Sequence, residues 1–158
     1  IIVEYSNKNT TCESVEQDSD TLLNSQREEK EILSECIIAI GRYVGKLLKA
    51  VGRRTCFELI VYYAYDLEKR AVVFPKLKFK QSLEYAQNKI VEYTMANVEK
   101  GVFHPQIPVR SLIMFVSSFI DGIAQSTATG VMEGDDISEE INVMFQILAK
   151  VVLGYLEA

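Results

Sequence analysis

The strongest hydrophobic pattern in the chain lies between residues 109 and 130. Bulky apolar residues recur there at steps of three and four, the spacing of one face of a helix. Another face carries small residues, which let a second helix approach closely. Gly122 costs about 1 kcal/mol relative to alanine in mid-helix, so close packing against a neighbour is its simplest explanation. We therefore expect the chain to be organised around this helix. Its bulky face consists of Leu112, Phe115, Val116, Phe119, Ile120, Ile123 and Thr127.

A companion helix is predicted over residues 136–157. Asp136 can serve as its N-cap, and Glu139, three residues later, can complete a capping box. A turn at residues 130–134 would join the two helices into an antiparallel hairpin. This hairpin is apolar on more than one side, so two copies could pack as a four-helix bundle. The residues expected at this dimer interface are Ser118, Gly122, Gln125, Ser126, Met144, Leu148, Val151, Val152 and Tyr155.

Further helices are predicted upstream of this hairpin. Residues 26–50 form a strongly amphipathic helix. The apolar run at residues 59–65 could be a buried strand, because Ile, Val and Tyr favour strands. No second strand candidate accompanies it, so we interpret it as a short buried helix. Residues 67–99 form a long helix that Pro75 begins, kinks or interrupts, and that ends at Gly101.

The first 25 residues carry the weakest pattern. Residues 1–5 could be the end of a helix whose beginning is missing, because Ile1 is not a natural start. Residues 6–25 are polar without a clear apolar period, which predicts a loose connector or a solvated helix. The whole chain is therefore predicted to be all-α, with five or six helices.

Composition narrows the class of protein. A chain of 158 residues is most simply one domain, able to bury about 70 % of its unfolded surface. Its apolar runs are too short and too interrupted to span a bilayer, so we expect no membrane association. Its cysteines, Cys12, Cys36 and Cys56, form no paired framework, which favours a cytoplasmic location.

Charge is unevenly distributed. Residues 36–110 hold 13 basic and 6 acidic side chains, whereas both flanking segments are acidic. A basic segment can bind nucleic acid, but the net charge of −5 favours solvated helix faces and pairing with the acidic ends. Asp121 is either a solvated helix residue or a partly buried acid with a hydrogen-bonding partner.

The sequence offers no catalytic constellation. The single histidine, His104, lies directly before Pro105 in a proline-flanked turn, and one histidine cannot assemble a triad with further histidines or a helical di-iron site. Phosphate-binding glycine motifs are absent from the sequence. We expect no catalytic residue, metal or cofactor.

A cavity for a small organic molecule is the sharper hypothesis. Aromatic and apolar residues gather on segments that must face one another, and such pockets are mostly apolar with a few polar anchors. Each of these residues could equally be plain core. Glu58 could favour a cationic ligand, be solvated, or pair with Arg53 or Arg54. The candidates are Phe57, Glu58, Ile60, Val61, Tyr63, Tyr65, Gln87, Ile90, Tyr93, Phe115 and Phe119, with Asn97 as a further possible anchor.

The order of these segments resembles the C-terminal effector-binding and dimerisation domain of TetR-family transcriptional regulators. In that family a helix commonly ends with a glycine, an aromatic residue and a proline, which here are Gly101, Phe103 and Pro105. The next helix carries an Asp-Gly pair, which here is Asp121 and Gly122. The resemblance covers about residues 26–158 and rests on pattern and order.

The resemblance implies a function and a division of the chain. Residues 1–25 would connect to a helix-turn-helix domain that this chain lacks, residues 26–106 would bind the effector, and residues 107–158 would form the dimerisation hairpin. The expected protein is the sensor of a homodimeric repressor, released from operator DNA by a small apolar or amphipathic ligand. The alternative is a helical protein–protein interaction module without a small ligand.

Overall fold

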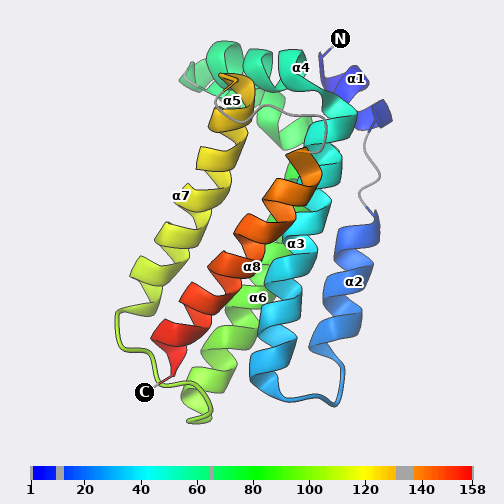
Figure 1. The fold of residues 1–158 in the computed structure, drawn as a ribbon. Helices are drawn as coiled ribbons and strands as arrows, with labels where there is room; N and C mark the ends of the chain where they lie inside the picture. The colour runs from blue at the N-terminus through cyan, green and yellow to red at the C-terminus, as the bar shows by residue number, and fades with distance from the viewer. Residues whose placement is uncertain (1, 10–12, 65, 131–136, 158) are drawn as a thin grey trace.

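The chain is all-helical. The computed structural model describes residues 2–9, 13–64, 66–130 and 137–157, which contain eight α-helices and no strand (Figure 1). A π-helical turn, Leu59–Ala64, continues α4, and a 3-10 turn, Phe74–Lys76, follows α5. The predicted all-α class is confirmed, but the predicted number of helices, five or six, was too low. The helices are α1 Ile2–Asn9, α2 Glu13–Leu23, α3 Glu29–Val51, α4 Arg53–Glu58, α5 Leu67–Val73, α6 Lys78–Glu99, α7 Val109–Ala128 and α8 Ile137–Leu156.

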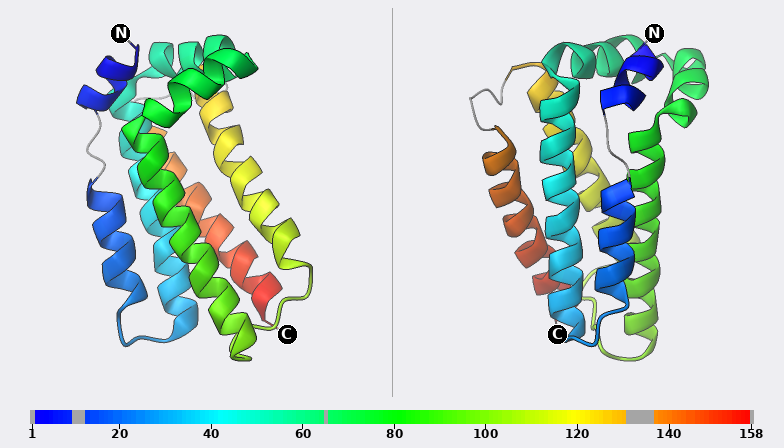
Figure 2. Two further views of the ribbon diagram at one scale, coloured as in Figure 1. Left: turned by 180° about the vertical axis from the view of Figure 1, so that it is seen from behind. Right: turned by 90° about the vertical axis from the view of Figure 1, so that its right-hand side faces the viewer.

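The central helix is α3, not α7 as the sequence pattern suggested. Helices α2, α6 and α8 surround it, and α8 makes the most extensive contact (Figure 2). Two glycines of α3 explain this closeness. A Cβ at Gly41 would lie 2.9 Å or less from three side-chain atoms of Phe145, and one at Gly45 would lie 3.2 Å from the Cβ of Ser138. Helix α8 therefore packs closely on the part of α3 where these two glycines carry no side chain.

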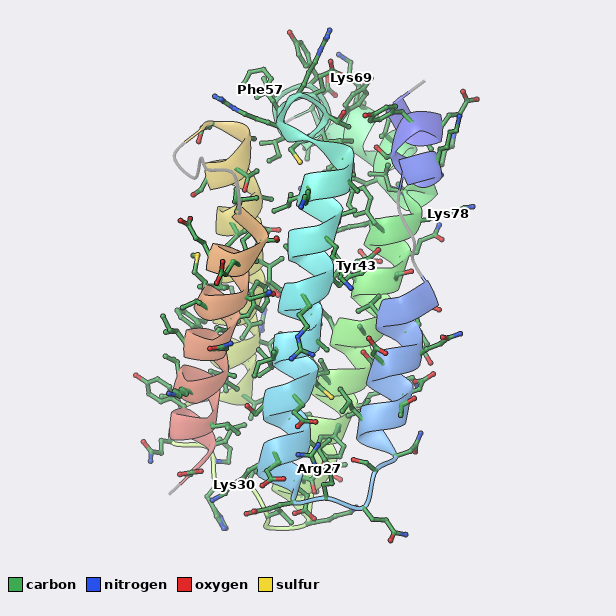
Figure 3. The ribbon with its side chains drawn as sticks, turned by 45° about the vertical axis from the view of Figure 1, so that its right-hand side comes forward. Arg27, Lys30, Tyr43, Phe57, Lys69 and Lys78 are labelled. Atoms are coloured by element: carbon green, nitrogen blue, oxygen red, sulfur yellow. The ribbon has the colours of Figure 1, made fainter. Side chains whose placement is uncertain are left out.

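Helices α4 and α5, with the π-helical turn between them, lie across one end of the bundle (Figure 1). The N-terminus and α1 lie at this same end, and the C-terminus lies at the opposite end. Asn7 of α1 ties this end to α6, because its side-chain oxygen accepts from the Lys78 amide at 2.9 Å and its Nδ2 donates to the Lys76 carbonyl at 3.1 Å. Phe57 and Lys69 extend outward here (Figure 3).

Residues 13–23 form a packed helix, which the sequence pattern did not resolve. Val15 is buried in the core, and two polar side-chain pairs join α2 to α6. The Tyr85 hydroxyl donates to the Asp20 carboxylate at 3.0 Å, and the Ser82 hydroxyl donates to Glu16 at 3.1 Å. Because these contacts are polar, they leave no hydrophobic period in the sequence.

The predicted long helix over residues 67–99 is interrupted at Pro75, as proline requires. Pro75 lies in the 3-10 turn, which separates α5 from α6. Gly101 has a φ of 75° directly after α6, the left-handed conformation of a helix-terminating glycine. The 59–65 run is helical as far as it is described, through residue 64, so the strand alternative is wrong for that part.

Helices α7 and α8 are antiparallel neighbours (Figure 1). Phe119 and Phe145 meet edge to face, with ring centroids 5.5 Å apart. The predicted connecting turn and the Asp136 cap fall largely on residues 131–136, outside the described residues. The hairpin is therefore present, but α8 rests mainly on α3. None of the described helices has the length and apolar character needed to cross a membrane.

Candidate functional site

The bundle contains an inner cavity of about 190 Å³ between α3, α6, α7 and α8. Aliphatic side chains dominate its wall, with a few neutral polar groups from α6 and α7. Small-molecule sites share this composition, being mostly apolar with few polar groups. The inner cavity is lined by Leu33, Ile37, Ile40, Gln87, Asn88, Ile90, Val91, Thr94, Val109, Leu112, Ile113, Val116, Ser117, Ile120, Phe145, Leu148 and Val152.

An outer cavity of about 430 Å³ lies next to it, toward the end covered by α4 and α5. Its wall combines apolar residues with charged ones. The outer cavity is lined by Val44, Leu47, Leu48, Val51, Cys56, Leu59, Ile60, Arg70, Phe74, Leu77, Phe79, Lys80, Leu83, Glu84, Gln87, Ser117, Ile120, Asp121, Ala124 and Gln125.

Three residues line both cavities, Gln87, Ser117 and Ile120, and we call the place where they lie the waist. Gln87 comes from α6, and the other two residues come from α7. Neither the Gln87 amide nor the Ser117 hydroxyl forms a side-chain hydrogen bond within the described part of the chain. Both groups are therefore available to a molecule that passes the waist.

Contacts at the two ends of α7 hold it in position. Near its start, the residue 100–108 connection is tied to the end of α8, because the His104 amide donates to the Leu156 carbonyl at 2.7 Å and the Gln106 amide to the Tyr155 carbonyl at 2.8 Å. Toward its other end, α7 packs against α4. Both cavities lie between α6 and α7, so these end contacts preserve the space.

The two cavities differ in charge. Among the described residues that line the inner cavity, none is ionisable. In the outer cavity Lys80 pairs with Glu84 at 3.9 Å, and the Arg70 guanidinium lies 5.4 Å from the centre of the Phe74 ring. Asp121 also faces the outer cavity and is exposed, in agreement with the solvated interpretation.

One thiol reaches the outer cavity. Cys56 lines it, and burial raises the pKa of this thiol to about 11. Cys36 is buried in α3, where burial raises its thiol pKa to about 12. Because the thiolate is the nucleophilic form, both thiols are protonated and unreactive at neutral pH.

The structure brings three of the predicted ligand-contacting residues to the cavities. Ile60 lines the outer cavity, Ile90 the inner one and Gln87 both. Tyr93 and Phe119 pack against the hydrophobic core, and Asn97 donates to the Tyr93 carbonyl at 2.9 Å. Tyr65 lies outside the described residues.

The remaining candidates lie away from the cavities. Phe57, Val61 and Phe115 are exposed, and Tyr63 is partly exposed. Glu58 pairs with Arg54 at 3.4 Å, so it is engaged in one of the ways that the sequence left open. The aromatic residues were thus a poor guide to the cavity wall.

Sequence reasoning missed most of the wall because it favoured aromatic residues. Aliphatic residues of α3 and α7, such as Ile37, Ile40, Ile113 and Val116, form much of it. In the sequence these residues are recognisable only as members of the apolar face of each helix. Such a face predicts that their side chains point inward, but it does not tell whether they line a cavity or fill a core. Arg70 was missed as well, since a basic residue on a short helix is usually solvated.

The last two helices present a partly apolar outer surface. Exposed apolar side chains occur on α7 and on α8: Met114, Phe115, Val143, Ile147 and Tyr155. Ser118 and Gln125 are exposed as well, and Gly122, Ser126, Met144 and Val151 are partly exposed. We call these eleven residues the outer α7/α8 surface.

Two residues expected at the dimer interface lie elsewhere. Leu148 and Val152 are buried in the protomer and line the inner cavity, because α8 turns this side toward α3. Gly122 has no atom within 4 Å of the position that a Cβ would take, so nothing within the protomer packs closely on it.

The single histidine, His104, is exposed in the connection between α6 and α7. Within the described ranges, no three His, Cys, Asp or Glu side chains gather as a metal site would require.

Comparison with known proteins gives no assignment. No protein-family model, no curated protein and no solved structure matches this chain.

Proposed function

We propose that this chain is the effector-sensing and dimerisation domain of a TetR-like transcriptional regulator. The observation that carries the proposal is the pair of adjacent cavities, which share three lining residues. Their volumes, about 190 and 430 Å³, are together within the roughly 300–1,000 Å³ typical of small-molecule sites. A protein whose helices served only to pack would have no need of such space, because protein interiors are normally filled to crystal-like density.

The outer α7/α8 surface supports the dimerisation part of the proposal. Met114 is 60 % exposed and Ile147 is 57 % exposed, on helices that the resemblance assigns to a dimer. Association of two copies through this surface would remove these side chains from water. In this proposal, operator binding belongs to a helix-turn-helix domain outside these 158 residues.

The structure also offers a route from the cavities to α1. Phe74, Leu77 and Lys80 line the outer cavity and flank the junction between α5 and α6. Asn7 of α1 bonds to Lys76 and Lys78 at this same junction. A ligand that binds one arrangement of the junction better than another would shift α1 with it, and would thereby change the spacing of attached DNA-binding domains.

Native mass spectrometry at low and then raised collision energy tests the proposal. We expect a dimer that carries a small organic mass at low collision energy and releases it at raised energy. A dimer that binds no compound from a broad chemical library would favour the alternative, a protein–protein interaction module. A monomer at micromolar concentration would contradict the dimerisation part of the proposal.

A further inference from the structure

The two cavities set different conditions on the two ends of a ligand. The inner cavity has an aliphatic wall without any ionisable side chain. Moving a charge into such a space is costly unless a partner accompanies it. The part of a ligand that enters the inner cavity is therefore uncharged and apolar.

The outer cavity tolerates a polar end but does not select its charge. Arg70 and Lys80 line it together with Glu84 and Asp121, so bases and acids are balanced. Lys80 and Glu84 already face each other at 3.9 Å. An anionic or cationic headgroup would thus meet a repelling group as well as an attracting one.

The waist adds a requirement for hydrogen bonding. Gln87 and Ser117 lie on opposite helices there, and neither side chain is hydrogen-bonded to another described residue. A purely hydrocarbon ligand would displace water from the half-buried Gln87 amide without replacing its hydrogen bonds, which is unfavourable, while the exposed Ser117 hydroxyl beside it would stay unused. A neutral oxygen placed between them can accept from the Gln87 amide and from the Ser117 hydroxyl.

We propose that the effector is an elongated neutral amphiphile, with an aliphatic chain in the inner cavity and a hydroxyl or carbonyl oxygen at the waist. This inference rests on the proposed small-molecule function and names the chemistry that the same site selects. Gln87 and Ser117 are its specificity-determining residues, and Val116 is one of the residues that bound the space for the chain.

Isothermal titration calorimetry with matched probes tests the ligand class. The probes are 1-octanol, octanoate, octylammonium and the compact alcohol 1-adamantanol. We expect 1-octanol to bind at least about 10-fold more tightly than each of the other three. With its chain in the inner cavity, each ion would place its charge near the neutral waist or beside the balanced charges of the outer cavity, where a repelling group offsets the attracting one. The compact alcohol cannot extend through the waist.

Variants test the two ends of the site separately. Gln87→Leu and Ser117→Ala should each weaken 1-octanol binding by about 10-fold, the usual scale for one lost hydrogen bond. Val116→Phe should abolish binding by filling the inner cavity. The matched control is Gln17→Leu on α2, an exposed residue outside both cavities, and should leave binding unchanged. Circular dichroism verifies that each variant folds. If Gln87→Leu does not fold, Ser117→Ala still tests the waist, because it changes the side-chain volume least.

Each other outcome overturns the inference. Equal or tighter binding of octanoate, octylammonium or 1-adamantanol would mean that the site selects a different ligand class. Unchanged 1-octanol affinity in both waist variants would mean that Gln87 and Ser117 do not contact the ligand. If no probe binds but native mass spectrometry finds another organic mass, only this inference fails. If neither method finds a ligand, the proposed effector-sensing function fails with it.

Discussion

Two glycines of α3 determine how closely α8 can approach. Gly41 faces Phe145 and Gly45 faces Ser138, one helical turn apart along α3. Phe145 is only 1 % exposed, and the Cβ of Phe145 itself would lie 2.5 Å from the added methyl group, so turning the ring toward the inner cavity that it lines cannot relieve the overlap. In helix interiors glycine costs about 0.5–1 kcal/mol relative to alanine, and here that cost is offset by the packing it permits.

Gly41→Ala should therefore destabilise the protein, although alanine is the better helix former. A Cβ would lie 2.9 Å or less from three side-chain atoms of Phe145, and overpacking of this kind typically costs about 1–3 kcal/mol. Urea unfolding followed by circular dichroism measures the change in the free energy of unfolding.

Gly154→Ala on α8 is the matched control. No atom lies within 4 Å of its Cβ position, so the same substitution should be neutral or stabilise by up to about 1 kcal/mol. Equal effects of the two substitutions would contradict the close approach of α8 to Gly41.

At the scale of elements, prediction worked where packing was apolar and failed where it was polar. Helices α3, α7 and α8 carry regular apolar faces, and each was predicted to within a few residues of its bounds. Helix α2 was not resolved, because its contacts with α6 depend on Tyr85–Asp20 and Ser82–Glu16 hydrogen bonds. Such pairs join residues more than 60 positions apart and leave no local period.

Helix α6 provides a second case in which a distant residue completes an element. Its N-cap residue, Leu77, makes no side-chain capping bond, and Asn7 of α1 accepts from the Lys78 amide instead. Helix-terminal amides need such partners, and side-chain caps are worth about 0.5–2 kcal/mol. The start of α6 and the position of α1 are therefore coupled.

Asn7→Ala should release α1 and fray the first turn of α6. We expect a loss of about 1 kcal/mol in unfolding free energy and faster hydrogen exchange at the Lys78 amide. Lys8→Ala, an exposed neighbour on α1, is the control and should leave exchange at Lys78 unchanged. Unchanged exchange in Asn7→Ala would show that α1 and α6 are not coupled through this side chain.

At the scale of the molecule, the sequence predicted the helical class but placed the centre wrongly. The apolar face of α7 suggested that it organises the fold, whereas α3 does so, because its two glycines admit α8. The cavity was harder to predict than the fold. Ile40 and Val116 have the same apolar character whether they fill a core or line a cavity. They line a cavity here because α6 and α7 lie apart, and the sequence does not show that separation.

Gly122→Leu tests how two whole molecules associate. Apart from its own stretch of helix, no atom of the described residues lies within 4 Å of its Cβ position, so the leucine should not unfold the chain and should even favour the helix. If two copies pack closely through the outer α7/α8 surface, the added side chain would hold them apart. We therefore expect sedimentation analysis to show a shift from dimer to monomer, with unchanged helicity by circular dichroism. Glu92→Leu, which adds an apolar residue on α6, should leave the dimer intact. An undiminished dimer in Gly122→Leu would mean that α7 does not meet its copy at this glycine.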